Sequence, residues 1–191
     1  MPIQNTESTL PAALGVSGTL SPRRGIFPVT PLTMIWRRML EPADALLSAV
    51  GLQGGLALAE RTIAVNEGQW VTLDTSGKAV VAGSAAIAPV GPVWSGGDRL
   101  DPKGGITVLH GAWVADTSYF DQGGTYAVGT LLQISGSVTV QGVAGQTGAL
   151  TPITIAAATD IFKVVAVVER APYGTSVDTP AGILRIRRVV L

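Results

Sequence analysis

Short apolar runs separated by turn residues fill the chain from about residue 56 onward. They are rich in Val, Ile, Thr and Trp, and Gly, Pro, Asp and Ser clusters separate them. The candidate strands are RTIAV, QWVTLD, KAVVA, IAPVGPVW, ITVLHGAWVA, TYAVG, TLLQIS, SVTVQG, FKVVAVVER and GILRIRRVVL. Because no helical segment comes between them, the pattern predicts a mainly β fold, an antiparallel β-barrel or β-sandwich, rather than a parallel α/β sheet.

Two apolar patterns among these runs predict different degrees of burial. Residues 69–74 alternate, so Trp70 and Thr72 should lie on the face opposite Val71. Residues 164–168, VVAVV, are apolar throughout, which predicts a strand buried on both faces.

A short phrase occurs twice, as GQWVTLDTSGKAVVAG at 68–83 and as GTLLQISGSVTVQG at 129–142. Each copy has apolar and polar residues, a Ser-Gly turn, a second apolar run and a closing Gly. Each therefore predicts a β-hairpin, and two similar hairpins favour an internal pseudo-repeat. Residues 142–160 have little charge and no clear period, which predicts a long loop with room for one extra strand.

The pattern before residue 56 differs. Residues 1–29 mix Pro, Gly, Ser and Thr without a period, which is typical of an arm or linker. From 31 to 50 apolar residues recur at helical spacing, with Thr30 available as a cap and Gly51 as a C-terminal stop. Pro42 interrupts this segment, so two short helices are favoured over one long helix.

The length of 191 residues suits one β domain with an appended extension. The predicted division is an N-terminal arm with one or two short helices, 1–55, and a β domain, 56–191. Neither a signal peptide nor an apolar run long enough to span a bilayer is evident, so we expect a soluble protein made in a cytoplasm.

Composition narrows the function classes. Thirteen basic and thirteen acidic side chains cancel, which gives no electrostatic argument for nucleic acid or an anionic membrane as partner. The chain has no cysteine, which excludes disulfides, thiol catalysis and Cys-ligated metals.

The charged fraction is low, at 14% against 47% hydrophobic residues, whereas typical domains carry about 25% charged residues. A chain that works inside an assembly exposes less surface to water, and obligate interfaces resemble a domain core cut in half. The composition therefore favours an assembly subunit; the alternative is a monomeric β protein with Gly-rich, Ala-rich and Thr-rich loops.

Candidate catalytic groups are few. The single histidine, His110, precedes Gly111 in a β run, which is typical of a strand bend and lacks the neighbours of a Ser-His-Asp or His-metal site. The acidic residues considered as calcium ligands lack the alternating pattern of calcium-binding loops and suit turns instead; they are Asp98, Asp101, Asp116 and Asp121. We predict no catalytic, cofactor or metal site, and no cofactor.

Candidate interface residues are arginines and one tryptophan. The sequence predicts core positions for Trp70, Trp94 and Trp113. Trp36 lies in IWRR, where it either docks on a partner or packs back on the β domain. The candidate interface residues are Arg23, Arg24, Trp36, Arg37, Arg38, Arg185 and Arg187. In the run 182–191 Arg188 falls in phase with the apolar positions Leu184 and Ile186, whereas Arg185 and Arg187 face the other way.

The order of GQWVTLDTSGKAVVAG, GPVWSGGD, the second hairpin phrase and a closing VVAVVERAP…AGILRIRRVVL resembles the head decoration, or cement, proteins of tailed bacteriophages. The resemblance covers about 56–191. It implies a flexible N-terminal arm before a compact β domain, and oligomers, often trimers, that sit on the capsid lattice at local symmetry axes. The long 1–55 segment with helical character departs from that pattern.

We therefore expect a non-enzymatic virion structural protein that stabilises the capsid. Its expected partners are the major capsid protein and further copies of itself as a homotrimer or homodimer, without nucleic acid or membrane. Its expected location is the capsid surface of the virion, after synthesis in the host cytoplasm. Two alternatives are a tail or connector ring subunit and a tail or fibre module that binds a host-surface glycan, the latter through an exposed cluster of Tyr119, Phe120 and Tyr126.

Overall fold

The computed structural model describes residues 25–31, 34–43, 47–49, 61–63, 65–84, 89–94 and 105–190, of which 47–49 and 61–63 are described by their backbone alone. The fold is mainly β with antiparallel sheets, which confirms the predicted class. The described strands form open sheets and no closed barrel. Among these residues no helix has the length and apolar character needed to cross a membrane.

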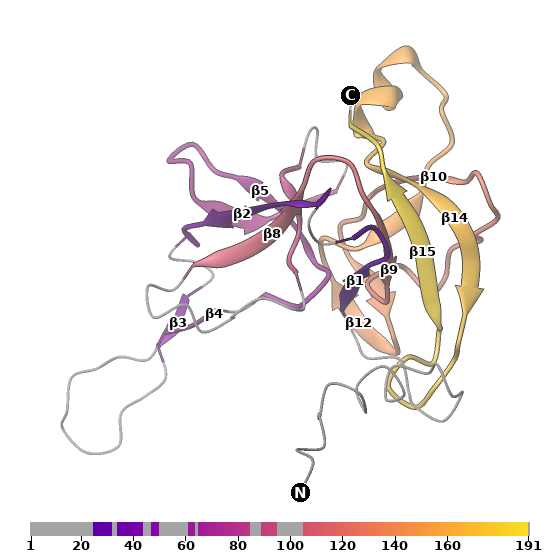
Figure 1. Cartoon of the computed structure of the whole chain (residues 1–191), viewed down its shortest axis with the longest axis horizontal. Helices are drawn as coiled ribbons and strands as arrows, with labels where there is room; N and C mark the ends of the chain where they lie inside the picture. Colours follow the sequence, from indigo (N-terminus) through magenta and orange to yellow (C-terminus); the bar gives the residue numbers. More distant parts are fainter. Residues whose placement is uncertain are drawn as a thin grey trace, which may run out of the picture.

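The larger sheet has six strands in the order β1-β9-β15-β14-β10-β13. They are β1 (Ile26–Pro28), β9 (Val114–Thr117), β15 (Ile183–Arg188), β14 (Ala166–Tyr173), β10 (Leu131–Ile134) and β13 (Leu150–Pro152). In β15 Leu184 and Ile186 are fully buried while Arg187 is exposed, so the alternation that the sequence predicts is present. This sheet forms one side of the molecule (Figure 1).

The remaining strands form smaller sheets. They are β2 (Trp36–Leu40) with β8 (Ile106–His110); β3 (Leu47–Ala49) with β4 (Arg61–Ile63); β11 (Val138–Val140) with β12 (Val143–Gln146); and β6 (Ala79–Val81), β5 (Trp70–Leu73) and β7 (Gly91–Pro92) in that order. A 3₁₀ helix, η4 (Ala158–Lys163), precedes β14. The group containing β2, β5 and β8 lies beside the larger sheet (Figure 1).

Backbone contacts tie β7 to β8. Val93 and Val108 form an antiparallel bridge, and the N–H of Trp94 donates to the carbonyl of Thr107 at 3.0 Å. The two backbones approach so closely that a Cβ atom on Gly91 would collide with the carbonyl oxygen of Leu109. Glycine is therefore needed at this crossing because it has no side chain.

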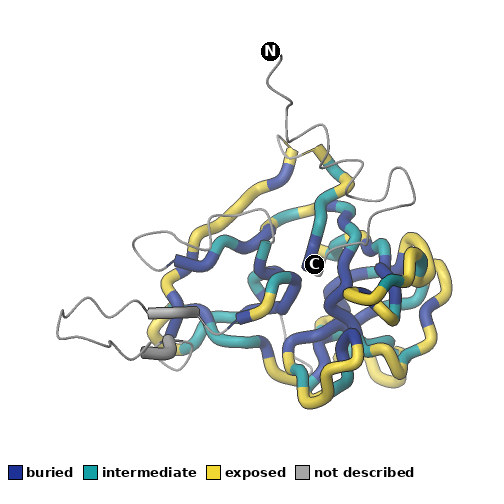
Figure 2. The backbone as a smooth tube through the Cα atoms, turned by 90° about the horizontal axis from the view of Figure 1, so that it is seen from below, coloured by how far each residue is buried: buried dark blue, intermediate teal, exposed yellow. Residues whose placement is uncertain are grey.

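Two main cores result from this arrangement. The larger core lies under the six-stranded sheet and includes Trp70 and Leu109, which come from strands of the smaller sheets. The second core lies within the smaller sheets, around Val71 and Val108. Figure 2 shows the buried backbone running through the interior of the molecule, with exposed stretches at its periphery.

The predicted helices between 31 and 50 are wrong for the part of that segment that the structure describes. Residues 36–40 are β2, which pairs with β8 from Trp36↔His110 to Leu40↔Ile106, and residues 47–49 are β3. Tertiary pairing has overridden the helical spacing, because Leu40 enters the second core once it lies opposite Ile106. Strands β1 and β2 thus pair with strands of the predicted β domain; residues 1–24 lie outside the described part.

The duplicated phrase folds as a hairpin in its first copy alone. Strands β5 and β6 pair directly, as predicted. In the second copy β10 pairs with β13 and β14, whereas β11 pairs with β12, so the hairpin prediction for 129–142 is wrong. Both edges of β10 are occupied by β13 and β14 in the larger sheet, so β11 cannot pair with it. The predicted loop at 142–160 instead holds β12, β13 and η4, and the predicted strand TYAVG is a turn region.

We predict that Gly91→Ala lowers the free energy of unfolding by about 1–3 kcal/mol, because the new methyl group must push the β7 and β8 backbones apart. The matched control is Gly83→Ala, where an added Cβ meets no atom within 4 Å and which we expect to change stability by less than about 0.5 kcal/mol. Urea unfolding of both variants measures the difference. Equal midpoints would show that the backbone crossing is not as tight as described.

Candidate functional site

Strand β2 exposes large apolar side chains. Trp36 is 75% exposed and Met39 61%, and Met34, just before the strand, is 66% exposed. Among the described strands only β8 pairs with β2. Contiguous exposed apolar surface marks interaction sites, and tryptophan is enriched at the energetic centres of interfaces. Met34, Trp36 and Arg38 are called the β2 patch below; Met39 lies on the other face of the strand, because it is one residue from Arg38.

The two arginines of β2 point in different directions. The guanidinium of Arg37 lies 5.1 Å from the ring centre of Trp94, a cation–π contact on the face that carries Leu109. Arg38 shares the opposite face with Trp36, because they are two residues apart in a strand. His110 lies opposite Trp36 in the ladder and therefore belongs to the face of Arg38.

A groove of about 570 Å³ opens on that face. One wall comes from the smaller sheets and includes Arg38, Val90 and His110; the other comes from η4 and the end of the larger sheet and includes Phe162, Arg188 and Val190. Phe162 and Val190 are 55% and 62% exposed. The groove thus lies between the two groups of strands, which is a common location for binding sites.

Arg188 lies at the base of this groove and connects segments from its two sides by hydrogen bonds. One guanidinium nitrogen donates to the carbonyl of Pro89 at 2.9 Å and the other to the carbonyl of Val165 at 3.3 Å. The guanidinium also lies 4.6 Å from the ring centre of Trp70. No carboxylate of the described residues pairs with it. Burial lowers the pKa of Arg188 to about 10, because the surroundings disfavour its charged form.

The other predicted interface arginines have different positions. Arg185 forms two hydrogen bonds to the Asp116 carboxylate, at 2.8 and 2.9 Å, which raise the pKa of the guanidinium. Arg187 pairs with Glu169 at 2.8 Å. Both arginines therefore tie β15 to its neighbours in the sheet. Arg23 and Arg24 lie outside the described residues.

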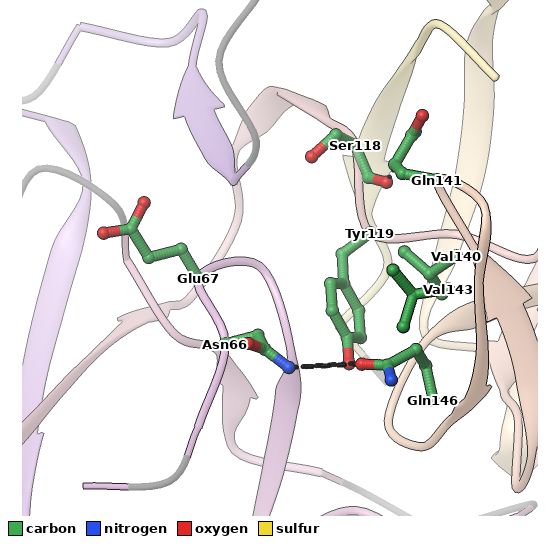
Figure 3. Close-up of a pocket in the computed structure, with 8 residues that line it drawn as sticks. All are labelled: Asn66, Glu67, Ser118, Tyr119, Val140, Gln141, Val143 and Gln146. Atoms are coloured by element: carbon green, nitrogen blue, oxygen red, sulfur yellow. Dashed lines mark hydrogen bonds between the residues drawn. The ribbon is translucent and has the colours of Figure 1, made fainter. Parts of the chain in front are cut away.

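A second pocket of about 380 Å³ lies between the segment before β5 and the strands β11 and β12 (Figure 3). Asn66 faces Tyr119 and Gln146 across it. The Asn66 amide donates to Gln146 Oε1 at 3.2 Å and approaches the Tyr119 hydroxyl at 3.4 Å, and that hydroxyl lies 3.1 Å from Gln146 Oε1. Burial raises the pKa of Tyr119, and the hydrogen bond from Asn66 partly opposes this.

Gln141 sits at the edge of this second pocket and is only 3% exposed. Its amide nitrogen donates to the carbonyls of Ser118 and Gly182, each at 2.9 Å, and its oxygen accepts from the N–H of Ala181 at 3.0 Å. Its φ of +47° is in the left-handed region, which side chains other than glycine rarely adopt. The polar side chains around this pocket form hydrogen bonds with one another and with the backbone. They therefore have a structural role, which is to connect neighbouring segments.

The structure does not support the aromatic cluster expected of a glycan-binding module. Tyr119, Phe120 and Tyr126 are 5%, 1% and 8% exposed, so that prediction of exposed rings is wrong. The rings pack inward because Phe120 and Tyr126 meet edge to face, with centres 5.2 Å apart, in the larger core.

Of the remaining candidates for chemistry, Asp116 does not have the turn role that the sequence suggested, because it lies in β9 and pairs with Arg185. His110 ends β8, is exposed and precedes Gly111 at φ +79°, as a strand bend requires. Asp121 accepts the N–H of Gly123 at 2.9 Å and so stabilises a turn. Within the described residues no three His, Asp or Glu side chains gather where a metal could bind. Asp98 and Asp101 lie outside those residues.

Sequence reasoning named Trp36, Arg37 and Arg38 as candidates, of which Arg38 lines the groove, but it did not name Arg188 or Phe162. A signal for Arg188 was present, because it falls in phase with the buried Leu184 and Ile186 of β15. A cation on the apolar face of a strand indicates either a buried pair or a binding site. No such signal exists for Phe162, which lies in η4 within the predicted loop.

Comparison with family models, curated proteins and solved structures finds no match to this chain.

We predict that Gln141→Leu lowers the free energy of unfolding by about 3 kcal/mol, because leucine leaves two buried carbonyls and one N–H without the partner that Gln141 supplies. The control is Gln122→Leu, which removes one hydrogen bond at the surface, to the N–H of Gly142, and should cost less than about 1 kcal/mol. Chemical denaturation of both variants checks this. A similar loss in the two would refute the structural role of Gln141.

Proposed function

We propose that the protein is a non-enzymatic structural subunit that binds and stabilises the capsid lattice of a tailed phage as a decoration oligomer. The observation that carries the proposal is the β2 patch, in which Trp36 and Met34 are exposed beside Arg38. An exposed tryptophan with a methionine and an arginine is the composition of an interface centre. The resemblance of the sequence to head decoration proteins is the reason for proposing a phage capsid as the assembly.

The low charge of the chain supports the same proposal. Thirteen acidic side chains are present in 191 residues, and Asp116 and Glu169 form ion pairs with Arg185 and Arg187 within the larger sheet. Burying the β2 patch against a partner would remove apolar surface from water, which stabilises the complex by about 25 cal/mol for each Å² buried. The expected partners are the major capsid protein and other copies of this chain.

Stabilisation would follow from binding equilibrium. A protein that binds the assembled lattice and not its separate subunits shifts the equilibrium toward the lattice. If the protein is a trimer or dimer, each oligomer presents several β2 patches, and the second contact then forms at a high effective concentration. No chemical step is required, and the location in this proposal is the capsid surface.

We predict that Trp36→Ala weakens binding to empty capsids by about 30-fold, the loss typical of an interface hot spot. Its effect on folding should be small, because the side chain is 75% exposed. The matched control is Val128→Ala, which removes another exposed apolar side chain, 72% exposed, outside the β2 patch. Co-sedimentation with capsids assembled from the phage major capsid protein measures both affinities, and light scattering gives the oligomer mass.

Two results would contradict the proposal. One is a wild-type protein that stays monomeric and does not sediment with capsids. The other is Trp36→Ala binding as tightly as Val128→Ala, which would show that the β2 patch is not the contact surface.

A further inference from the structure

We infer that the groove between the two groups of strands binds an extended peptide segment of a partner protein, and that this segment carries one acidic side chain flanked by apolar residues. The inference rests on the proposed function only in taking the partner to be a subunit of the same assembly. It concerns Arg38, His110 and Arg188 with the apolar walls around Phe162 and Val190.

The charge of the groove specifies the acidic side chain. Arg38 and Arg188 both line it, and its described lining residues include no Asp or Glu. Of the N–H groups of Arg188, two are directed to the carbonyls of Pro89 and Val165, and a guanidinium has five donors. The remaining donors and the uncompensated charge favour a carboxylate, which arginine binds in a planar, two-pronged geometry.

The walls of the groove specify apolar flanking residues. Phe162 and Val190 are more than half exposed at one side, and Val90 packs against the second core at the other. A small anion would contact the arginines and leave these side chains in water. A carboxylate on a peptide with apolar neighbours covers both kinds of surface, and covering them removes water from around Arg188, which strengthens its attraction for the carboxylate.

The β2 patch specifies that the occupant belongs to a larger partner. Trp36 lies opposite His110 in the β2–β8 ladder, so the exposed indole is next to the groove on the same face. A partner surface that covers Trp36 would therefore bring its adjoining segment to Arg38. The groove thus extends the proposed contact surface and gives it a charge requirement.

A randomised library of eight-residue peptides, selected on the purified wild-type protein, tests the inference without any capsid. We expect the selected peptides to contain Asp or Glu between apolar residues. Replacing that residue by Asn or Gln in a synthetic peptide should weaken binding about tenfold in a calorimetric titration. Selection of neutral or basic peptides, or of none, would overturn the inference. So would dodecanoate binding as tightly as the best peptide, since the groove would then be a fatty-acid site.

Matched variants locate the binding to the groove. Arg38→Glu should weaken the best peptide at least about tenfold, whereas Arg37→Glu, with the same change in charge on the opposite face, should weaken it less than about twofold. Val190→Asp should weaken binding in the same way as Arg38→Glu, whereas Val177→Asp, at a site 94% exposed and outside the groove, should not. Equal effects within either pair would overturn the inference.

The same variants separate this inference from the proposed function. If peptides bind as described but the wild-type protein does not sediment with capsids, the groove is confirmed and the capsid role fails. If the protein sediments with capsids, and Val190→Asp and Val177→Asp do so equally well, the capsid role stands and the groove is not part of the contact.

Discussion

The burial of Trp70 joins the two groups of strands, and the positions of the other features depend on it. Trp70 belongs to β5 of the smaller sheets, yet its fully buried ring packs in the core of the larger sheet, 6.1 Å from the ring of Trp113. The backbone N–H of Trp70 donates to the carbonyl of Gly148 at 2.9 Å, and an added Cβ on Gly148 would come within 2.9 Å of the Trp70 carbonyl oxygen. Because Arg188 stacks on the same ring, the packing of Trp70 also fixes the floor of the groove.

Arg185 and Arg188 show how position within one strand decides what an arginine does. Both lie on β15, but Arg185 meets a carboxylate on β9, whereas Arg188 projects from the buried face toward carbonyls and an aromatic ring. Removing a charge from water is unfavourable unless an opposite charge compensates it. The first arginine contributes to holding the sheet together. The second has two backbone carbonyls and the ring of Trp70 as its partners instead of a carboxylate.

Local patterns predicted the strands well and their partners less well. The alternation in β15, the hairpin of β5 and β6 and the core positions of Trp70 and Trp113 followed from spacing and turn residues. The strand at Trp36–Leu40 could not be predicted, because its apolar spacing fits a helix and its partner, β8, is about seventy residues away. Likewise, a Ser-Gly turn after β10 indicates a hairpin, but competition from β13 and β14 decides the actual pairing. The groove is built from residues distant in sequence, so the sequence pattern could not bring them together.

The position of β15 has a consequence for how the chain folds during synthesis. Among the described strands β15 comes after all the others in the larger sheet, yet it lies inside that sheet and joins the pair β1–β9 to the strands β14, β10 and β13. Until it leaves the ribosome, β9 and β14 each have an unpaired inner edge that could pair with another chain. The larger sheet is therefore completed only once β15 has emerged, through contacts distant in sequence, and such topologies fold slowly. Nascent chains translated close together on one messenger RNA would therefore be the most prone to pair with each other through the free edges of β9 and β14.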